Sequence, residues 1–282
     1  MNNPYAVLDQ FVLDTLLDHK EEVSWRFEFR GSSLPSCPRA LMFGLFHKKR
    51  PEEFPKKDED FTMRYHFHVG RAVHALVQET WGSQGLLWGD WSCSDLNACG
   101  MVFQNTRLPH GKCLRCHAPA TYVEKVVHDP STGFSGHCDG LVFCEKLNGY
   151  VVLELKTRNH NIIAKAVKPY ESDLYQVSAY ATLISQNYWI PIVGRMILWV
   201  GKPRPKPHKM WFYPGTGSSL FQEEQDKKKT LDACLKKGQP EDVPGVCDVI
   251  SDGDGCPWQG VCFSPKREKI VQEMFKKFTK DQ

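Results

Sequence analysis

The chain has 282 residues, of which 41% are hydrophobic and 24% are charged, and this composition supplies enough apolar material for a sizeable buried core. It excludes wholesale disorder and favours one large domain, or a core that carries an insertion. The 36 lysine and arginine residues nearly balance the 33 acidic residues, so a nucleic-acid partner would have to be bound by local basic clusters and not by the net charge of +3.

The sequence also predicts the compartment. No stretch approaches the roughly 18–20 apolar residues of a membrane helix, and the first ten residues lack the apolar stretch of a signal peptide. We therefore expect a cytoplasmic protein without a membrane partner. The 11 cysteines are odd in number, and in a reducing compartment cysteines gathered in loops favour metal ligation over disulfides.

The first part of the chain is expected to be mainly helical, with one short strand around residues 25–29. A charged stretch over residues 48–60 with two prolines predicts a loop. Residues 85–120 contain four cysteines and several glycines without helical periodicity, which predicts a small loop-rich insertion. Helices are expected over residues 5–17, 39–46 and 62–81.

The rest of the chain alternates between strands and helices. The pair Asn148-Gly149 lies between two expected strands and is a strong hairpin signal. Helices are expected over residues 173–187 and 219–237, and a basic helix closes the chain. Strands are expected over residues 121–128, 134–144, 150–157, 193–200 and 209–213.

Two acidic residues and a lysine on neighbouring strands form the most informative pattern. Strand alternation places Glu154 and Lys156 on one face, and Asp139 lies on the strand before them. Two carboxylates suit Mg²⁺ or Mn²⁺, which prefer oxygen ligands. Such an ion polarises a phosphodiester, while the lysine can orient a water molecule or offset developing charge. The alternative is a surface hairpin with a cross-strand salt bridge.

The metal hypothesis places a demand on the hairpin. A tight two-residue turn would place Glu154 opposite Phe143 and would leave Asp139 about 13 Å further along, too far for a shared ion. The hypothesis therefore requires a longer loop, over about residues 144–149, or a bend near Gly140.

Three polar side chains on helices accompany the hairpin. His74 lies beside the apolar stripe of its helix, where an imidazole could reach a metal; the alternative is a structural histidine. Gln176 and Tyr180 are four residues apart and therefore lie side by side on their helix. They could grip a phosphate or the lysine, or form a hydrogen-bonded pair at the edge of the core.

Four motifs follow one another along the chain: Gly70-x3-His74, Gly136-His-x-Asp139-Gly, Glu154-x-Lys156-Thr and Gln176-x3-Tyr180. In this order they resemble the PD-(D/E)XK nuclease superfamily, and most closely its RecB-type exonuclease branch, which includes CRISPR-adaptation and phage-type iron–sulfur exonucleases. The matched motifs cover about residues 37 to 262. The resemblance implies an α/β fold with a restriction-endonuclease-like core, in which a mixed sheet is flanked by helices.

The resemblance also implies an activity, which is Mg²⁺- or Mn²⁺-dependent cleavage of DNA, often from an end. It makes Asp139, Glu154 and Lys156 catalytic, with Lys156 as the catalytic lysine and with Gln176 and Tyr180 in support. The metal ligands that it implies are His74, Asp139, Glu154 and Leu155.

Many RecB-type nucleases hold a 4Fe-4S cluster between one early cysteine and three late ones, which would clamp the two chain ends together. Cys37 matches the early position, and Cys256-Pro-Trp-x3-Cys262 matches the last two late positions. The family's remaining cysteine falls at Gly253 here, so Cys247 could substitute, with Cys234 as a weaker candidate. The ligand set is then Cys37, Cys247, Cys256 and Cys262. The alternative is a degenerate site that is empty or holds zinc.

The cysteines of residues 85–120 form a second set, Cys93-x5-Cys99-x13-Cys113-x2-Cys116. The second pair is a knuckle typical of structural zinc, and a tetrahedral Zn²⁺ would fold a segment that has few apolar residues of its own. The first pair is spaced more widely, so His110 or His117 could replace a ligand. A zinc-bound insertion would stiffen a projection beside the substrate path. Cys138 and Cys144 are expected to be ordinary core cysteines.

We therefore expect an exonuclease that acts on linear or single-stranded DNA in the cytoplasm of a bacterial or phage-infected cell, with recruitment to a recombination or repair complex. The alternatives are an endonuclease and a non-catalytic nucleic-acid-binding protein that kept the fold. Basic runs near the C-terminus would hold backbone phosphates, with aromatic side chains stacking on bases; solvated helix faces are the alternative. These runs are Lys227–Lys229, Lys236–Lys237 and the lysines and arginine of residues 266–280.

Four parts are expected along the chain. They are an N-terminal helical part of the core over residues 1–84, a zinc-binding insertion over 85–120, the catalytic sheet and helix over 121–215, and C-terminal helices with the cysteine loop over 216–282.

Overall fold

A computed structural model describes residues 29–30, 37–49, 61–95, 97, 99–202, 208–245, 262 and 264–279. Four expectations fall wholly or largely outside these residues: the helix over residues 5–17, most of the strand over residues 25–29, most of the loop over residues 48–60, and the positions of Cys247 and Cys256.

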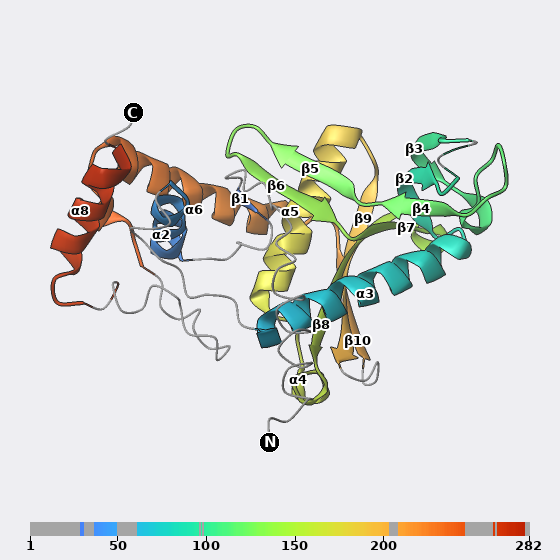
Figure 1. The fold of residues 1–282 in the computed structure, drawn as a ribbon, viewed down its shortest axis with the longest axis horizontal. Helices are drawn as coiled ribbons and strands as arrows, with labels where there is room; N and C mark the ends of the chain where they lie inside the picture. Colours follow the sequence, from blue (N-terminus) through green and yellow to red (C-terminus); the bar gives the residue numbers. More distant parts are fainter. Residues whose placement is uncertain are drawn as a thin grey trace, which may run out of the picture.

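The centre of the fold is a seven-stranded sheet (Figure 1). Its strands pair in the order β10-β9-β8-β7-β2-β3, and β4 also pairs with β2. Only the pair β8–β9 is parallel, so the sheet is mixed but mostly antiparallel. The strands are β2 (Leu87–Cys93), β3 (Val102–Arg107), β4 (Ala120–Val123), β7 (Gly140–Cys144), β8 (Gly149–Asn159), β9 (Ile192–Lys202) and β10 (His208–Pro214).

A smaller sheet of three strands, in the order β1-β6-β5, lies beside the main one. It consists of β1 (Phe29–Arg30), β5 (Lys125–Asp129) and β6 (Phe134–Cys138). The chain passes directly from a strand of one sheet to a strand of the other at two residues: at Glu124, between β4 and β5, and at Asp139, between β6 and β7. The expected strands over residues 121–128 and 134–144 are therefore each divided in two at an acidic residue.

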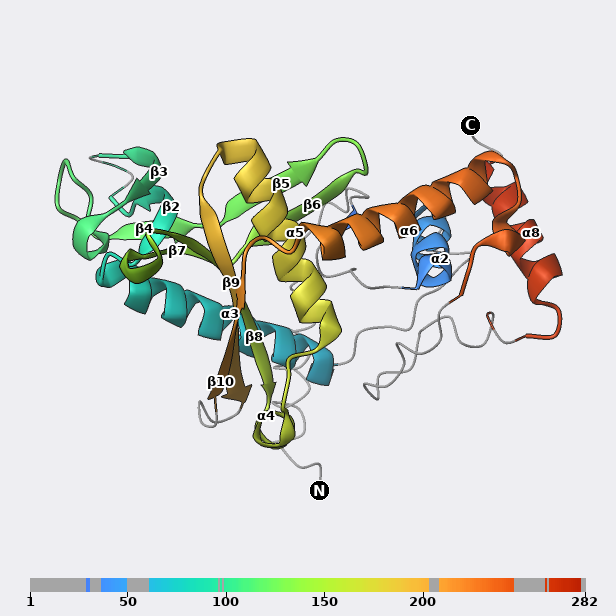
Figure 2. The same ribbon diagram turned by 180° about the vertical axis from the view of Figure 1, so that it is seen from behind.

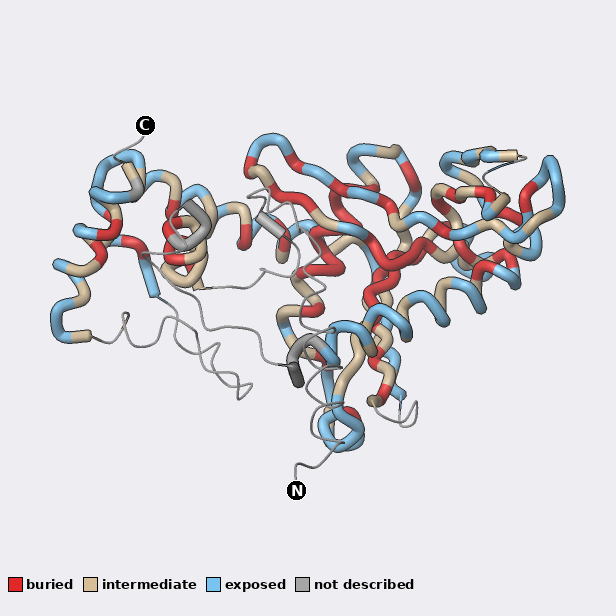
Figure 3. Tube along the Cα trace, viewed as in Figure 1, coloured by how far each residue is buried: buried red, intermediate tan, exposed pale blue. Residues whose placement is uncertain are grey.

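Helices cover the sheets. α3 (Phe61–Ser83) contacts β2, β4 and β8 and crosses in front of β8 in Figure 1, while α5 (Glu171–Tyr188) contacts β5, β6, β8 and β9 (Figure 2). The outward side of α3 is exposed along much of its length (Figure 3). The other helices are α2 (Pro38–Lys49), α4 (His160–Lys165), α6 (Ser218–Lys236) and α8 (Arg267–Thr279), with 3-10 turns η2 (Pro109–Gly111), η3 (Glu145–Leu147) and η4 (Pro240–Asp242). No described helix is both long enough and apolar enough to span a membrane.

Three hydrophobic cores hold these elements together, and the smallest consists of Leu87, Trp91, Leu108 and Tyr122. The main core lies between α5 and the strands and includes Leu141, Val152, Ile197 and Trp199. The second core lies between α2, α6 and α8, at the opposite end of the molecule from β3 (Figure 1). Its buried members are Met42, Phe43, Phe46, Leu231, Val243, Val271 and Met274. Burying each large apolar side chain stabilises the fold by about 1.5–3 kcal/mol.

The expected secondary structure needs one substantial correction. Residues 85–120 are not merely loop-rich, because they contain β2, β3 and the start of β4, and β2 pairs with β7 inside the main sheet. The side chains of β2 alternate strictly between buried and partly buried positions, which is the pattern of a strand with one covered face. α4 was not expected either. The expected helices over 39–46, 62–81, 173–187 and 219–237, and the strands over 150–157, 193–200 and 209–213, are confirmed.

Candidate active site

The two crossing points between the sheets lie side by side. In the β5–β6 pair, Lys125 lies opposite Cys138. One residue further along the antiparallel register, Glu124 therefore faces Asp139. The chain enters the small sheet at Glu124 and leaves it at Asp139, so both acidic side chains lie where the two sheets separate.

The pairing of β7 with β8 adds a third acid to this row. Gly140 lies opposite Leu153, so Asp139 and Glu154 are the two residues that directly follow the end of this pairing. Three acidic residues from three separate segments are thus neighbours across the strands.

The hairpin between β7 and β8 has the longer loop that the metal hypothesis required. Cys144 pairs with Gly149, and the four residues between them form η3 and a left-handed Asn148 at φ 46°. Asparagine tolerates this conformation better than most residues. A two-residue turn would have placed Phe143 opposite Glu154, whereas Phe143 in fact pairs with Tyr150.

Asp139 is held from two sides. Its Oδ2 accepts a hydrogen bond from the backbone N–H of Leu155 at 2.6 Å, and its Oδ1 lies 3.2 Å from Nδ1 of His74 on α3. Gln78, one turn beyond His74, donates to the backbone oxygen of Asp139 at 2.9 Å. The side chain of Leu155 is apolar and fully buried, so this residue can reach an ion only through its main chain.

Glu124 belongs to the same cluster, although the sequence analysis did not single it out. One ligand atom each from His74, Glu124 and Asp139 all lie within 4.8 Å of one another. Gln78 donates to Oε1 of Glu124 at 2.9 Å, and Nδ1 of the exposed His137 lies 3.9 Å from its Oε2. The only signal in the sequence is an acid that interrupts an alternating strand, and this has no meaning until the register is known.

Charge governs the protonation of His74. Burial lowers its pKa, but the hydrogen bond and charge of Asp139, together with the charge of Glu124, outweigh that effect. The pKa of His74 is therefore raised above 6.5.

Glu154 is almost completely buried, with 1% of its surface exposed, and its Oε1 lies 2.6 Å from Nζ of Lys156. Burial raises the pKa of Glu154 well above its usual range, the positive charge of Lys156 opposes this, and the charge of Asp139 adds to it. Burial lowers the pKa of Lys156, but the charges of Glu154 and Asp139 outweigh it and leave that pKa raised. Oε2 of Glu154 has no hydrogen-bond partner among the described residues.

That orphaned oxygen is informative because buried polar atoms normally have partners, and one without a partner is costly. A cation beside Asp139 would satisfy it. The donors gathered here are carboxylate oxygens and an imidazole nitrogen, and Mg²⁺ and Mn²⁺ accept such ligands. The residues present therefore fit a divalent ion. Glu154 itself lies outside the group formed by His74, Glu124 and Asp139.

Gln176 and Tyr180 hold the lysine, which is one of the alternatives that their spacing left open. Nζ of Lys156 donates to Oε1 of Gln176 at 3.0 Å, and Nε2 of Gln176 donates to the hydroxyl of Tyr180 at 2.9 Å. Tyr180 lies directly over Gly136, where a Cβ atom would be only 2.5 Å from its ring. Burial, together with the charge of Glu154, raises the pKa of Tyr180 well above 10.0, so its hydroxyl keeps its proton.

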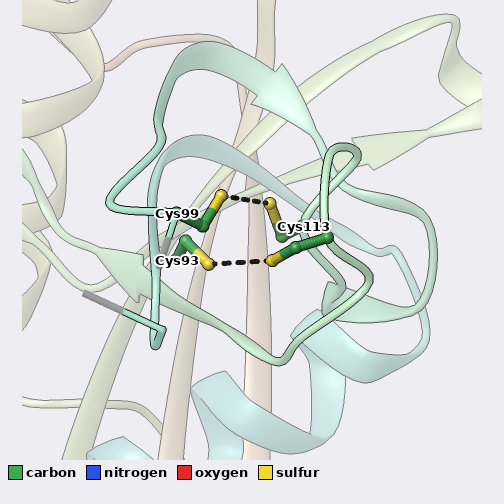
Figure 4. Close-up of side chains that lie close together, drawn as sticks. Cys93, Cys99 and Cys113 are labelled. Carbon is green, nitrogen blue, oxygen red and sulfur yellow. Dashed lines mark hydrogen bonds between the residues drawn. The ribbon is translucent and has the colours of Figure 1, made fainter. Parts of the chain in front are cut away.

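The four cysteines of residues 85–120 come together at the end of β2 (Figure 4). The Sγ atoms of Cys93 and Cys116 are 3.5 Å apart, those of Cys99 and Cys113 are 3.7 Å apart, and all four lie within 4.8 Å of one another. Burial raises the pKa of Cys113, but backbone N–H groups of Cys116 and Arg115 outweigh this and lower it to about 6. Burial and the neighbouring thiols raise the pKa of Cys93 to about 12.

The alternative ligands His110 and His117 are not members of this cysteine group. Of the remaining cysteines, Cys138 is fully buried in the main core, as expected, and Cys144 is partly buried.

The cysteines considered for an iron–sulfur cluster are described only in part. Cys37 immediately precedes α2 and is partly buried. Cys234 and Cys262 both pack against the second core, to which α2 also contributes. Cys247 and Cys256 lie outside the described residues.

The basic run on α6 is largely neutralised. Lys227, Lys228 and Lys229 each form an ion pair with an acid on the same helix. The acids are Glu224, Asp232 and Asp226. This arrangement favours the alternative of a solvated helix face over a phosphate-binding surface for these three lysines.

No protein-family profile matches the chain, and no curated protein matches it. The solved structures that are similar to it include two of an alkaline exonuclease. LHK-Exo in complex with dAMP matches with 13% identity and a TM-score of 0.43, over 76% of this chain and 90% of that one. An alkaline exonuclease (LHK-Exo) from Laribacter hongkongensis matches with 11% identity and a TM-score of 0.36, over 74% and 94%. Both TM-scores are low, and the function proposed below therefore depends on the geometry of the site and on the motifs of the sequence, and not on these two structures.

Proposed function

We propose that the protein is a metal-dependent DNA nuclease of the PD-(D/E)XK superfamily, with a restriction-endonuclease-like core. The observation that carries this proposal is the arrangement around Asp139. This residue is fixed between His74 and the backbone of Leu155, and it directly precedes Gly140, which pairs with the residue before Glu154. Oε2 of Glu154 has no hydrogen-bond partner among the described residues. Lys156 is paired with the same glutamate.

His74, Asp139, Glu154 and the main-chain carbonyl of Leu155 would hold Mg²⁺ or Mn²⁺, and Glu124 extends this ligand set. The ion, when bound, would supply Lewis acidity toward the scissile phosphate and would lower the pKa of a water molecule. The RecB-type branch, with cleavage from DNA ends or of single strands, is the finer form of the proposal.

The remaining polar residues prepare the lysine for this chemistry. Lys156 would orient the attacking water and offset the negative charge that develops on the phosphate. Gln176 fixes the position of Nζ, and Tyr180 in turn fixes the amide of Gln176. The charges of Glu154 and Asp139 raise the pKa of Lys156, which favours a role for it as a cation.

Digestion of end-labelled DNA in the presence of Mn²⁺ tests the proposal. We expect the wild-type protein to shorten linear DNA, and we expect Lys156→Ala to lose activity by about 100-fold or more, a typical cost of removing a group that stabilises developing charge. Lys165→Ala, which removes an exposed lysine on the neighbouring α4, is the matched control and should keep wild-type activity.

The same assay separates the alternatives. Cleavage of circular DNA would indicate an endonuclease. Wild-type protein that binds DNA without any Mn²⁺-dependent cleavage would contradict the proposal and would favour a non-catalytic nucleic-acid-binding protein.

We also propose zinc as the ion of the four-cysteine cluster. A tetrahedral Zn²⁺ with bonds of about 2.3 Å to sulfur places its ligands about 3.8 Å apart. The measured separations of 3.5 and 3.7 Å are close to this value. A single ion among four thiolates therefore fits the site.

A 4Fe-4S cluster on Cys37, Cys247, Cys256 and Cys262 is the third metal centre that we propose, with Cys234 as the weaker substitute. Its support is the position of Cys262 against the core that α2 and α8 share, because Cys37 directly precedes α2. We also propose recruitment to a recombination or repair complex and a location in the cytoplasm, because the sequence motifs resemble those of RecB-type nucleases.

A further inference from the structure

We propose that the four-cysteine zinc site holds Glu124 in place, so that the occupancy of zinc controls the affinity of the active site for its catalytic ion. The inference rests on the proposed function, since Glu124 is taken as part of the divalent-metal site. The four cysteines take no part in the proposed nuclease chemistry, and this inference gives them a function.

The cysteine cluster joins the end of one strand to the beginning of another. Cys93 is the last residue of β2 and lies opposite Ala120, the first residue of β4. Cys113 and Cys116 lie in the segment that leads into β4, where the N–H of Cys113 donates to the carbonyl of Ala118 at 2.8 Å. An ion bound by all four thiolates would therefore fix where β4 starts along β2.

Apart from β2, β4 contacts α3 and η2. Among the described residues its only strand partner is β2, through four residue pairs. Tyr122 is its only buried residue, and the ring of Tyr122 lies edge-on to Trp91 of β2 with the ring centroids 5.3 Å apart. A four-residue strand with one buried side chain has little hydrophobic stabilisation of its own, so its position depends on what holds its ends.

The other end of β4 delivers Glu124 to the active site. Val123 pairs with Asp90 of β2, and the carboxylate of Asp90 also binds Nζ of the buried Lys125 at 2.9 Å. Glu124 therefore lies between Val123, which pairs with Asp90, and Lys125, which forms an ion pair with Asp90. A shift of β4 by one residue would turn Glu124 to the opposite face and away from Gln78 and Asp139.

The distance along β4 between the cysteine cluster and Glu124 is short enough for the two metal sites to be coupled. Ala120 and Glu124 are four residues apart, which is about 13 Å along a strand. The intervening segment pairs continuously with β2, so a register fixed at the cysteine end is transmitted to the acidic end.

The test compares the zinc content, the Mn²⁺ affinity and the amide exchange of variants of the full chain. We expect wild-type protein to contain one zinc and Cys113→Ser to contain none. In this variant the affinity for Mn²⁺ should fall by about tenfold, the low end of the 10–100-fold typical of groups that orient metal ligands. Amide protons of residues 120–125 should exchange faster, while those of β8 and β9 should stay protected.

Three further variants keep the test decisive. Cys116→Ser removes an exposed ligand and replaces the first variant if Cys113→Ser does not fold. Cys144→Ser, in β7 of the same sheet but outside both metal groups, should keep zinc and wild-type affinity for Mn²⁺. Glu124→Gln should keep its zinc and lose affinity for Mn²⁺.

The outcomes distinguish the coupling from the nuclease proposal. Equal Mn²⁺ affinity, or equal amide exchange at residues 120–125, in wild-type and zinc-free protein would overturn the coupling alone. Absence of zinc from wild-type protein would overturn it as well. Wild-type protein that binds Mn²⁺ but cleaves no DNA would overturn the proposed activity, while the coupling would still be decided by the affinities. Wild-type protein that binds no Mn²⁺ would overturn both.

Discussion

Tyr180 lies so close to the backbone of β6 that only a residue without a side chain fits beneath it. A Cβ atom at Gly136 would lie 2.5 Å from Cε1 and 2.7 Å from the hydroxyl oxygen of Tyr180, closer than non-bonded atoms approach. The hydroxyl is the group that accepts the hydrogen bond from Gln176, and Gln176 in turn holds Lys156. A single glycine thus determines where the lysine can be held.

Gly136→Ala should therefore destabilise the protein, because the added methyl group must displace the ring or the strand. We expect a loss of about 1–3 kcal/mol in the free energy of unfolding, the usual cost of overpacking a core, measured by urea denaturation. Gly44→Ala in α2, where nothing lies within 4 Å of the added atom, is the control and should be neutral or stabilising. Equal losses in the two variants would contradict this account of Tyr180.

At the scale of elements, one acidic residue fastens the small sheet to α6. Asp129, at the end of β5, accepts hydrogen bonds from Ser131 and Thr132 in the following turn and from Nε2 of Gln225 on α6 at 2.9 Å. Burial raises its pKa, but the hydrogen bonds outweigh that effect, and the pKa of Asp129 is lowered below 3.8. The charged form of this residue therefore stabilises the folded state.

Because the pKa of Asp129 is lowered in the folded state, the stability of the protein depends on pH in a defined direction. The contribution of Asp129 is fully present above its unfolded pKa of about 3.9 and is lost as the pH falls through the lower folded value. We expect Asp129→Asn to lower the stability by about 1–3 kcal/mol near neutral pH. The difference in Tm between the two proteins should narrow below about pH 4.

Thermal unfolding at a series of pH values measures this effect. Gln225→Ala keeps the carboxylate but removes one donor, so it should reproduce only part of the loss. A difference in Tm that widens with acidification would show that Asp129 does not act through its charge.

At the scale of the whole molecule, α6 connects two separate cores. Phe221, near its start, belongs to the main core with α5 and the strands, whereas Leu231 belongs to the second core with α2 and α8 (Figure 1). Residues from both ends of the described chain therefore meet in the second core. This is the region where the proposed iron–sulfur cluster would join the two ends.

If the proposed 4Fe-4S cluster is present, protein purified without oxygen should show an absorbance band at about 400 nm from iron–thiolate charge transfer. Cys37→Ser should lose the band and the bound iron, and α2 and α8 should become less protected in amide exchange. Cys144→Ser should retain the band. Wild-type protein that is purified without oxygen and shows neither bound iron nor the band would contradict the proposed cluster. The second core would then be stabilised by hydrophobic packing alone.

Local patterns in the sequence were sufficient for much of this structure. The helices over 39–46, 62–81, 173–187 and 219–237 could be predicted because apolar residues recur at helical spacing within a single segment. The placement of Gln176 beside Tyr180 follows from the same periodicity, and the four-cysteine cluster could be recognised because Cys113 and Cys116 have the spacing of a zinc knuckle. Each of these features depends on residues that are close in the chain.

Only the tertiary structure decided the features that depend on register. The loop over residues 145–148 brings Asp139 next to Glu154, and a two-residue turn at residues 148–149 would have separated them. Glu124 joins the site because the chain crosses between the two sheets at Glu124 and again at Asp139, next to each other. β2 lies inside the main sheet because it pairs with the edge of β7 that β8 leaves unpaired. Strand pairing sums small contributions over distant segments, so the sequence of any one strand does not specify its partner or its alignment.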